Sequence, residues 1–188
     1  MRAMLSSMRG GSRADLSDRA VAASLREKGT MSDPVVLRAA TAEDAAVLAA
    51  TIAAAFAQYR GRLVPESGAF RETSEAVARE LAQGAGAIIA EQNGEAVGCV
   101  MLKPMGEDLY FGRLSVTPAA RGRGIARRLV EAVEDEARRR GARGVRLGVR
   151  IVLTDNQRLF TALGYRETSR EAHPGFGQPT SINMRKAL

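Results

Sequence analysis

A loop rich in glycine and arginine stands between a predicted strand and a long predicted helix. It reads Arg121-Gly122-Arg123-Gly124 and follows Leu114-Ser115-Val116-Thr117-Pro118. The first amides of a helix have no partner inside the helix, and the helix dipole adds partial positive charge there. Glycines leave these amides open to a phosphate, and the arginines can add charge-assisted hydrogen bonds. The sequence therefore predicts a site for a phosphate-bearing ligand.

Two other phosphate-binding loops do not fit this segment. A Rossmann fingerprint would require a third glycine at position 127, where the chain has Arg127. A P-loop requires Gly-Lys-Ser or Gly-Lys-Thr, and neither occurs in the chain. An ordinary helix start behind a flexible loop is the remaining alternative. The preceding strand, Pro118 and the helix that follows together favour the phosphate loop over it.

The elements that position this loop follow from hydrophobic periodicity and turn signals. They are predicted as strands at 35–38, 87–91, 95–102, 109–116, 145–151, 165–171 and 180–186, and helices at 45–56, 72–81, 125–140 and 156–163. Asn93-Gly94 marks a hairpin, and Asp44 is placed to cap a helix start at Thr41. Gly112 inside a strand indicates a bulge or a close backbone approach. Strands and helices mixed in this order indicate an α/β layer structure with a partly antiparallel sheet.

Composition excludes several classes of protein. The chain has 188 residues, enough for one ordinary domain, and Cys99 is its only cysteine, so no intrachain disulfide can form and a reducing cytoplasm is expected. No apolar run is long enough for a membrane span. The net charge is +7, but aromatic residues make up only 4% and the arginines are dispersed. This pattern argues against a nucleic-acid-binding surface and suits a ligand with several phosphate charges.

Residues 1–30 differ in composition from the rest of the chain. They are rich in Arg, Ser, Gly and Ala and lack the apolar stretch of a secretory signal. We interpret them as a disordered tail, or as the product of an upstream start codon, since Met31 precedes a segment that begins like a domain. The domain itself is expected to span 31–188.

The loop and its surroundings resemble the GNAT superfamily of N-acetyltransferases. The central motif of that family is Arg or Gln, two residues, Gly, one residue, then Gly or Ala. The chain matches it and two flanking motifs with Arg121-Gly122-Arg123-Gly124-Ile125-Ala126, with Leu114, Val116 and Pro118, and with Asn156 and Leu163-Gly164-Tyr165. The resemblance covers about 35–188.

This resemblance implies an α/β (α+β) fold with a mixed, partly antiparallel sheet of six to seven strands flanked by about four helices. Two adjacent parallel strands, at 109–116 and 145–151, are expected to splay apart and admit the pantetheine arm of acetyl-CoA. Acetyl-CoA is thus the implied co-substrate, and no metal is expected. Homodimers are common in the family, so a homodimer is compatible with the resemblance.

The resemblance also implies roles for particular residues. Main-chain amides of Leu114, Ser115 and Val116 would bind the pantetheine amides and the acetyl carbonyl, and one could stabilise the oxyanion. The pyrophosphate would meet the amides of Arg121, Gly122, Arg123, Gly124, Ile125 and Ala126. Asn156 and Phe160 stand at positions where the family meets the cofactor.

The catalytic groups are less defined. The attacking amine must lose a proton, and Glu66, Glu72, Glu107 and Asp108 are candidate bases by position, each also readable as a surface acid. Many family members have a tyrosine at the position of Phe160, where it protonates the leaving thiolate. Because phenylalanine cannot donate a proton, Tyr59, Tyr110 or water would have to replace it.

The acceptor cannot be read from the sequence. His173, in the last predicted loop, could line the acceptor pocket or lie in an exposed turn. Arg60 and Arg62 would suit an acceptor with a carboxylate, or lie on the surface. Cys99 is expected to be buried in a strand.

Three functions remain open on this basis. The first is an acetyl-CoA-dependent N-acetyltransferase acting on a small-molecule or peptide amine. The second, motivated by Phe160, is a sensor module that binds acyl-CoA with little or no transfer. The third, a basic nucleic-acid-binding domain, is disfavoured by the dispersed charge.

Overall fold

The computed structural model describes residues 33–188, so the predicted tail at residues 1–30 lies outside them. Residues Pro34–Leu188 form a compact unit. Its strands are β1 (Val36–Ala39), β2 (Gly86–Gln92), β3 (Glu95–Met105), β4 (Asp108–Val116), β5 (Gly144–Arg150), β6 (Arg166–Glu171) and β7 (Ser181–Ala187). Its α-helices are α2 (Ala45–Phe56), α3 (Ser74–Ala82), α4 (Ile125–Arg139) and α5 (Thr154–Ala162).

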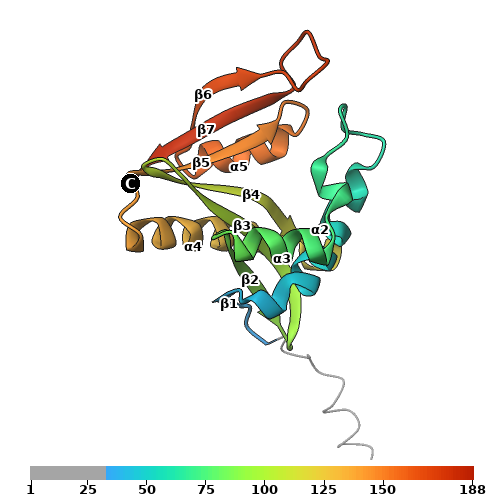
Figure 1. Ribbon diagram of the computed structural model, residues 1–188, viewed down its shortest axis with the longest axis vertical. Helices are drawn as coiled ribbons and strands as arrows, with labels where there is room; N and C mark the ends of the chain where they lie inside the picture. The colour runs from blue at the N-terminus through green and yellow to red at the C-terminus, as the bar shows by residue number, and fades with distance from the viewer. Residues whose placement is uncertain (1–32) are drawn as a thin grey trace, which may run out of the picture. The chain divides into compact units, whose positions relative to one another are not determined.

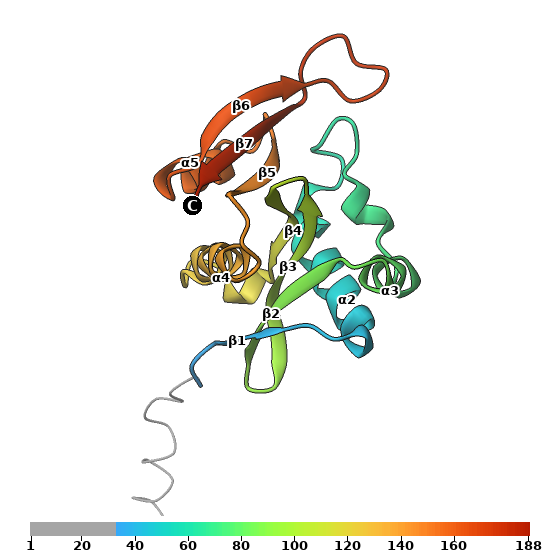
Figure 2. The same ribbon diagram turned by 60° about the vertical axis from the view of Figure 1, so that its left-hand side comes forward.

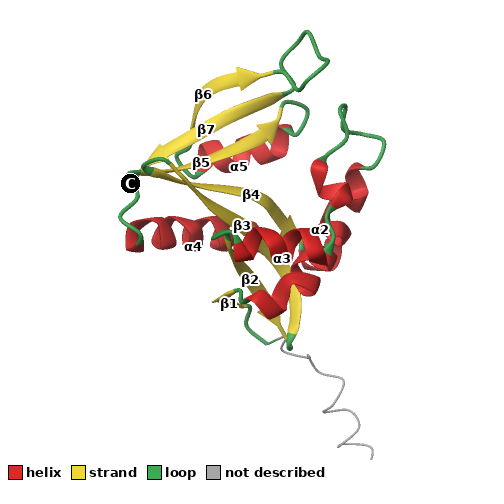
Figure 3. Ribbon diagram, viewed as in Figure 1, coloured by secondary structure: helices red, strands yellow, loops and turns green. Residues whose placement is uncertain are grey.

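The strands form one mixed sheet, as the resemblance implied. The seven strands are ordered β1-β2-β3-β4-β5-β7-β6, and every neighbouring pair is antiparallel except β4 and β5. The helices α2 and α3 pack on one face of the sheet, and α4 packs on the other, as Figure 3 shows.

The parallel pair is joined over only part of its length. Residues Asp108 to Phe111 of β4 pair with Gly144 to Leu147 of β5. Beyond Phe111 the edge of β4 that faces β5 has no strand partner, while β5 continues to pair with β7 as far as Arg150. Figure 1 shows the two strands diverging toward their C-terminal ends. The predicted splay between these strands is therefore confirmed, and we call it the strand fork.

A bulge in β4 coincides with the point at which the fork opens. Arg113 has a φ of 52°, and the pairing of β3 with β4 shifts register between Cys99 and Met101. An extra residue on one strand bends that strand and re-aims its side chains. The bulge suggested by Gly112 is thus present one residue later, and it turns β4 away from β5.

Two apolar clusters fill the two sides of the sheet. Every apolar residue of the stripe on α4 is buried: Ile125, Leu129, Val130, Val133 and Ala137. They pack with residues of the sheet face that includes Phe111 and Leu147, and α2 packs with residues such as Ile89 on the opposite face. Each fully buried aliphatic side chain contributes about 1.5–3 kcal/mol through the hydrophobic effect. The predicted helix stripe thus fixes α4, and with it the loop before α4, against the sheet.

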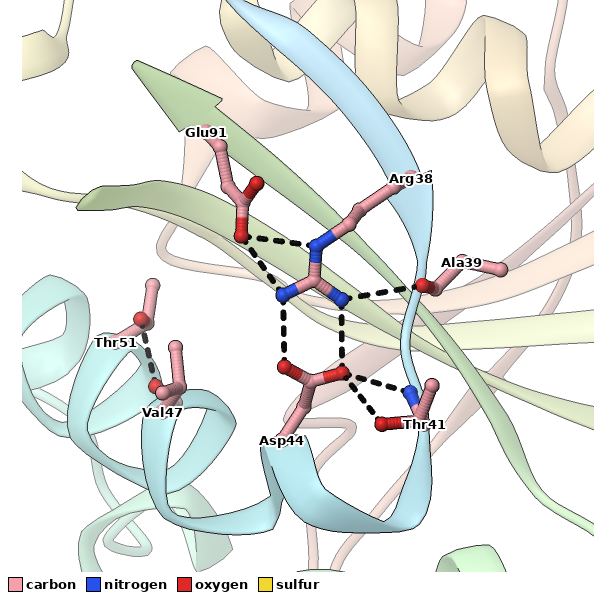
Figure 4. A network of polar contacts seen from close by, with 7 residues as sticks. All are labelled: Arg38, Ala39, Thr41, Asp44, Val47, Thr51 and Glu91. Atoms are coloured by element: carbon pink, nitrogen blue, oxygen red, sulfur yellow. Dashed lines mark hydrogen bonds and ion pairs between the residues drawn. The ribbon is translucent and has the colours of Figure 1, made fainter. Parts of the chain in front are cut away.

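A polar network fixes the entry to α2 (Figure 4). Asp44 accepts a hydrogen bond from the Thr41 amide at 2.7 Å, which confirms the predicted capping interaction. The Arg38 guanidinium donates to both oxygens of Asp44, at 2.8 and 2.7 Å, and to Glu91 at 2.9 Å. Arg38 holds the pKa of the Asp44 carboxyl far below its usual range. This joins β1, β2 and the start of α2.

A second network clamps the closed end of the strand fork. Asp108 on β4 accepts from Arg146 on β5 at 2.5 Å and from Arg185 on β7 at 2.8 Å. The Asp108 side chain is only 4% exposed. Hydrogen bonds from the two guanidinium groups lower the pKa of Asp108 from 3.8 to about 2. Asp108 is therefore a structural anchor, so its placement argues against the role of catalytic base.

Some element boundaries differ from those predicted. Strand β3 runs to Met105, three residues beyond the predicted end at Leu102. Pro104 is tolerated in the strand because β2 ends opposite Leu102, so no β2 residue lies opposite Pro104 to accept the hydrogen bond that proline cannot donate. Helix α3 begins at Ser74 because the Thr73 hydroxyl caps the Ala76 amide at 3.2 Å. Helix α5 begins at Thr154. No helix in the described part of the chain is long and apolar enough to cross a membrane.

Candidate active site

The glycine loop lies where the sequence predicted it, between β4 and α4. A 3₁₀ turn at Pro118–Ala120 leads into the loop, and α4 starts at Ile125. Gly122 and Gly124 both have φ near 75°. A Cβ on either residue would meet no atom within 4 Å, so glycine is required there for its backbone conformation and leaves the space beside the loop open.

The main-chain amides of this loop are unoccupied by other parts of the described chain. None of the amides from Gly122 to Arg127 donates a hydrogen bond to any residue of 33–188, and the first amide to close the helix is that of Arg128, which donates to the Gly124 carbonyl at 3.1 Å. These donors lie at the positive end of the α4 dipole. The arrangement is suited to bind an anion.

The side chains of the two loop arginines bond to other elements of the protein. Arg121 donates to the Ala55 carbonyl at 2.9 Å and to the Gln58 side chain at 2.8 Å. Arg123 donates to the Gln92 side chain at 2.7 Å. Each of the two side chains therefore ties the loop to another element, and their bonds to a phosphate stay a prediction. The donors that have no partner within residues 33–188 are the main-chain amides of the loop.

A cavity of about 300 Å³ lies beside the loop, along the open edge of β4. It is lined by Ala55, Phe56, Gln58, Tyr59, Leu114, Val116, Arg121, Ala126, Leu153, Asp155, Asn156 and Leu159. It brings together five of the sequence-predicted cofactor residues, from β4, the loop, α4 and α5. The Ser115 side chain is buried and its hydroxyl donates to the Arg113 carbonyl at 2.9 Å, so only its main chain remains for a ligand.

Phe160 does not line the cavity. It is 4% exposed, and its ring packs edge-on against Phe111 and Tyr165 with centroid distances of 5.8 and 6.1 Å. Its neighbours in α5, Asn156 and Leu159, line the cavity instead. The side chain at this position thus belongs to the core. The Ile125 side chain is likewise buried, which leaves its amide as the group that faces the loop.

A larger cavity, of about 610 Å³, lies against α3, on the face of the sheet that α2 and α3 cover. Its lining includes Glu72, Glu80, Tyr110, Gly112 and Arg113. Arg113 donates to Glu72 at 2.6 Å and also bonds to Glu80. The other carboxylate oxygen of Glu72 is buried and has no partner in the described chain.

Tyr110 lies at the point where β4 and β5 part. A Cβ at Gly112 would come within 3.2 Å of the Tyr110 ring, and a Cβ at Gly148 within 3.6 Å of its hydroxyl, so the ring extends along β4 and its hydroxyl reaches β5. Burial raises the pKa of Tyr110, which keeps the hydroxyl protonated. Lys103 lies 5.0 Å from the ring centroid. Of the candidate catalytic residues, the structure brings Glu72 and Tyr110 to one cavity.

The remaining candidate bases lie elsewhere. Glu66 is exposed, and its side chain forms no hydrogen bond or ion pair with any residue of 33–188. Glu107 forms an ion pair with Arg143 on the surface, at 3.1 Å. Cys99 is buried, and burial raises its thiol pKa to about 12, so it is not a nucleophile. The described residues contain no group of three or more His, Cys, Asp and Glu placed to hold a metal ion.

Sequence reasoning missed Arg150, at the end of β5. It donates to the His173 ring at 2.8 Å and to the Pro65 carbonyl, so it joins two loops beside the fork. Because arginine can only donate, His173 accepts through Nε2 and keeps its proton on Nδ1, which lies 2.5 Å from the Thr180 hydroxyl. Burial and the nearby Arg150 charge lower the pKa of His173. No local sequence signal marks this contact.

Comparison with known proteins gives a consistent result. The acetyltransferase (GNAT) family matches residues 52–165 in sequence. No curated protein matches the chain. Among solved structures, the PaiA N-acetyltransferase of Thermoplasma acidophilum in complex with coenzyme A has a TM-score of 0.68 at 16% identity, covering 83% of this chain and 100% of that one.

Two further structures are similar. A ribosomal-protein-alanine N-acetyltransferase from Brucella melitensis has a TM-score of 0.66 at 22% identity, covering 81% of this chain and 99% of its own. The putative acetyltransferase yncA from Salmonella typhimurium, with acetyl-CoA, has a TM-score of 0.66 at 21% identity, covering 83% and 95%. At these identities the structures show the shared fold. With the family match over more than half of its length, the chain belongs to the GNAT family of acetyltransferases.

Proposed function

We propose that this protein transfers an acetyl group from acetyl-CoA to a primary amine of a small molecule or peptide, by direct attack in a ternary complex. The observation that carries the proposal is the row of unpartnered amides from Gly122 to Arg127, next to the open edge of β4. Similar structures are described with coenzyme A and with acetyl-CoA. A cytoplasmic location is part of the same proposal.

The cofactor site follows the cavity along β4. The diphosphate would accept hydrogen bonds from the loop amides, where the helix dipole favours negative charge. The pantetheine arm would lie in the strand fork against the main chain of Leu114, Ser115 and Val116, with Asn156 on its other side. A main-chain amide on this edge of β4 would stabilise the oxyanion that forms during transfer.

The chemistry requires two proton movements. The neutral amine nitrogen attacks the thioester carbonyl to give a tetrahedral intermediate, whose nitrogen gives up a proton. The carbon–sulfur bond then breaks, and the leaving thiolate takes a proton. We assign Glu72 as the base, acting through water, because it lines the same cavity as Tyr110. Tyr110 is assigned as the proton donor at the fork. Its raised pKa keeps that proton available at neutral pH.

The test compares glutamate substitutions at two glycines. Gly124→Glu places a carboxylate beside the loop amides, whereas Gly106→Glu is the matched control in the β3–β4 turn. Both residues have positive φ (75° and 61°) and open space around the Cβ position. Calorimetry with acetyl-CoA should show a loss of at least about 100-fold in affinity for the first variant, from repulsion and blocked amides, and wild-type affinity for the control. Equal affinities in both variants would exclude the loop as the phosphate site.

The alternative function is a sensor that binds acyl-CoA with little or no transfer, and the burial of Phe160 supports this alternative. The position that often carries the acidic tyrosine is here a core residue. Release of free thiol from acetyl-CoA in the presence of an amine panel distinguishes the two functions. Tight acetyl-CoA binding without thiol release across a broad panel would favour the sensor.

A further inference from the structure

Arg150 lies on the face of the sheet from which an acceptor would approach. Side chains alternate along β5, with Val145, Leu147 and Val149 buried in the cluster against α4. Arg150 and Gly148 therefore face the other side, together with the Tyr110 hydroxyl. Two residues along a strand span about 6–7 Å, so the Cα of Arg150 lies about that far from the Cα of Gly148, which is next to the Tyr110 hydroxyl.

The Arg150 guanidinium has no acidic partner in the described chain. Its two side-chain contacts are neutral acceptors, the Pro65 carbonyl and the ring of His173. Arg150 is partly buried, and burial lowers its pKa. Of the five guanidinium hydrogens that an arginine can donate, these contacts use two. A partly desolvated cation with free donors is a binding site for an anion.

Other arginines on this face are neutralised. Arg146, on the same strand, pairs with Asp108, and Arg113 pairs with Glu72 and Glu80. Arg150 differs from both in having only uncharged partners, which hold the guanidinium in place without compensating its charge. Its position is also fixed from two sides, since Pro65 lies in the loop after α2 and His173 in the loop between β6 and β7. Figure 2 shows these two loops on the same side of the sheet.

We infer that Arg150 binds a carboxylate on the acceptor, so that the substrate is an amine that also carries a carboxylate, such as an amino acid. This inference rests on the proposed function and names its substrate class. The geometry fits a compact acceptor. A carboxylate on Arg150 would leave the amine close to the fork, beside Tyr110, where the thioester is proposed to lie.

The first experiment measures binding to the protein saturated with coenzyme A, which lacks the acetyl group and so prevents turnover. Calorimetry compares common L-amino acids with the corresponding amino-acid amides, which keep the amine and lack the charge. At least one acid should bind about 10- to 100-fold tighter than its amide, the range expected for charge-assisted hydrogen bonds. The amine of an amino-acid amide loses its proton more readily than that of the free acid. If binding required a neutral amine, this difference would favour the amide, against the preference for the acid that we expect.

Variants then assign the preference to Arg150. Arg150→Gln should reduce the ratio of acid to amide affinity to near one, with amide affinity unchanged, while Arg150→Lys should keep part of the ratio. Arg146→Gln, on the same strand and face, is the matched control and should keep the full ratio. A merely structural role for Arg150 would lower both affinities together. Unfolding temperatures confirm that the variants fold.

The outcomes separate this inference from the proposed function. If coenzyme A binds but acids and amides bind equally well, or no carboxylate-bearing amine binds, Arg150 is not a substrate anchor and the acetyltransferase proposal stands. A preference that survives in Arg150→Gln overturns the assignment in the same way. If coenzyme A itself does not bind, both the proposed function and the inference fail.

Discussion

Replacing Asp108 with asparagine should remove the charged clamp at the closed end of the strand fork. Asp108 on β4 holds Arg146 of β5 and Arg185 of β7, and these are the three adjacent strands that meet there. Asparagine has the shape of the protonated acid but no charge. The substitution therefore tests the ionic contribution of the clamp with little change in packing.

The magnitude follows from the pKa of Asp108. Its value of about 2, against an ordinary 3.8, is a shift of nearly two units, worth about 2 kcal/mol of unfolding free energy. Since Asp108 is only 4% exposed, solvent screens little of this interaction. The folded pKa lies below the unfolded one, so the contribution is complete above about pH 4 and is lost as the pH falls through 2. Arg146 and Arg185 are 46% and 30% exposed, so water can solvate both in the variant.

Urea denaturation at several pH values between 7 and 2 provides the assay. Asp108→Asn should be less stable than wild type by about 2 kcal/mol at pH 7, with the difference shrinking steeply below pH 4. Glu107→Gln is the control, because its surface pair with Arg143 involves side chains that are 68% and 73% exposed and should contribute less than about 0.5 kcal/mol. A loss in Asp108→Asn no larger than in the control, or one that persists at pH 2, would refute the ionic explanation.

Three further predictions concern the site. Gly122→Ala should lower stability by about 1 kcal/mol through its positive φ and weaken acetyl-CoA binding about tenfold or more, while Gly106→Ala should show only the stability loss, as measured by urea denaturation and calorimetry. Tyr110→Phe should lower kcat about 100-fold with acetyl-CoA affinity unchanged in the same calorimetric assay, and an unchanged kcat would remove it as the proton donor. Cys99 should not react with a thiol reagent at pH 8 until urea unfolds the protein, since its pKa is about 12; rapid reaction of the folded protein would contradict its burial.

The sequence predicts those parts of the fold that depend on local pattern. The apolar stripe of α4 and the turn at Asn93-Gly94 both lead directly to observed elements, because periodicity and turn chemistry act over a few residues. The strand fork is different. Its opening depends on where the pairing of β4 with β5 stops, at Phe111 and Leu147, and these lie on strands separated by the whole of α4. Resemblance to a family supplied the fork, and local pattern did not.

Side-chain roles at the site were harder to predict than main-chain roles. The glycines predict open amides because their effect is local, and the structure has those amides unpartnered in the described chain. Arg121, by contrast, bonds to Gln58 and Ala55, which are 63 and 66 positions away. Phe160 likewise turns into the core, where Phe111 and Tyr165 meet it. Long side chains can reach several elements, so only the tertiary arrangement decides their partners.

The positive charge of the chain acquires a structural explanation from these contacts. Arg146 and Arg185 bind Asp108 at the closed end of the fork, and Arg121 ties the loop before α4 to the end of α2 at the open end. Arginine suits these contacts because the several N–H donors of its planar guanidinium can bond to two strands, or to a helix end and a loop, at the same time. The excess of basic residues therefore need not indicate a nucleic-acid partner. Arg150 holds two loops in the same manner, but its partners within the described residues are uncharged, so they do not compensate its charge.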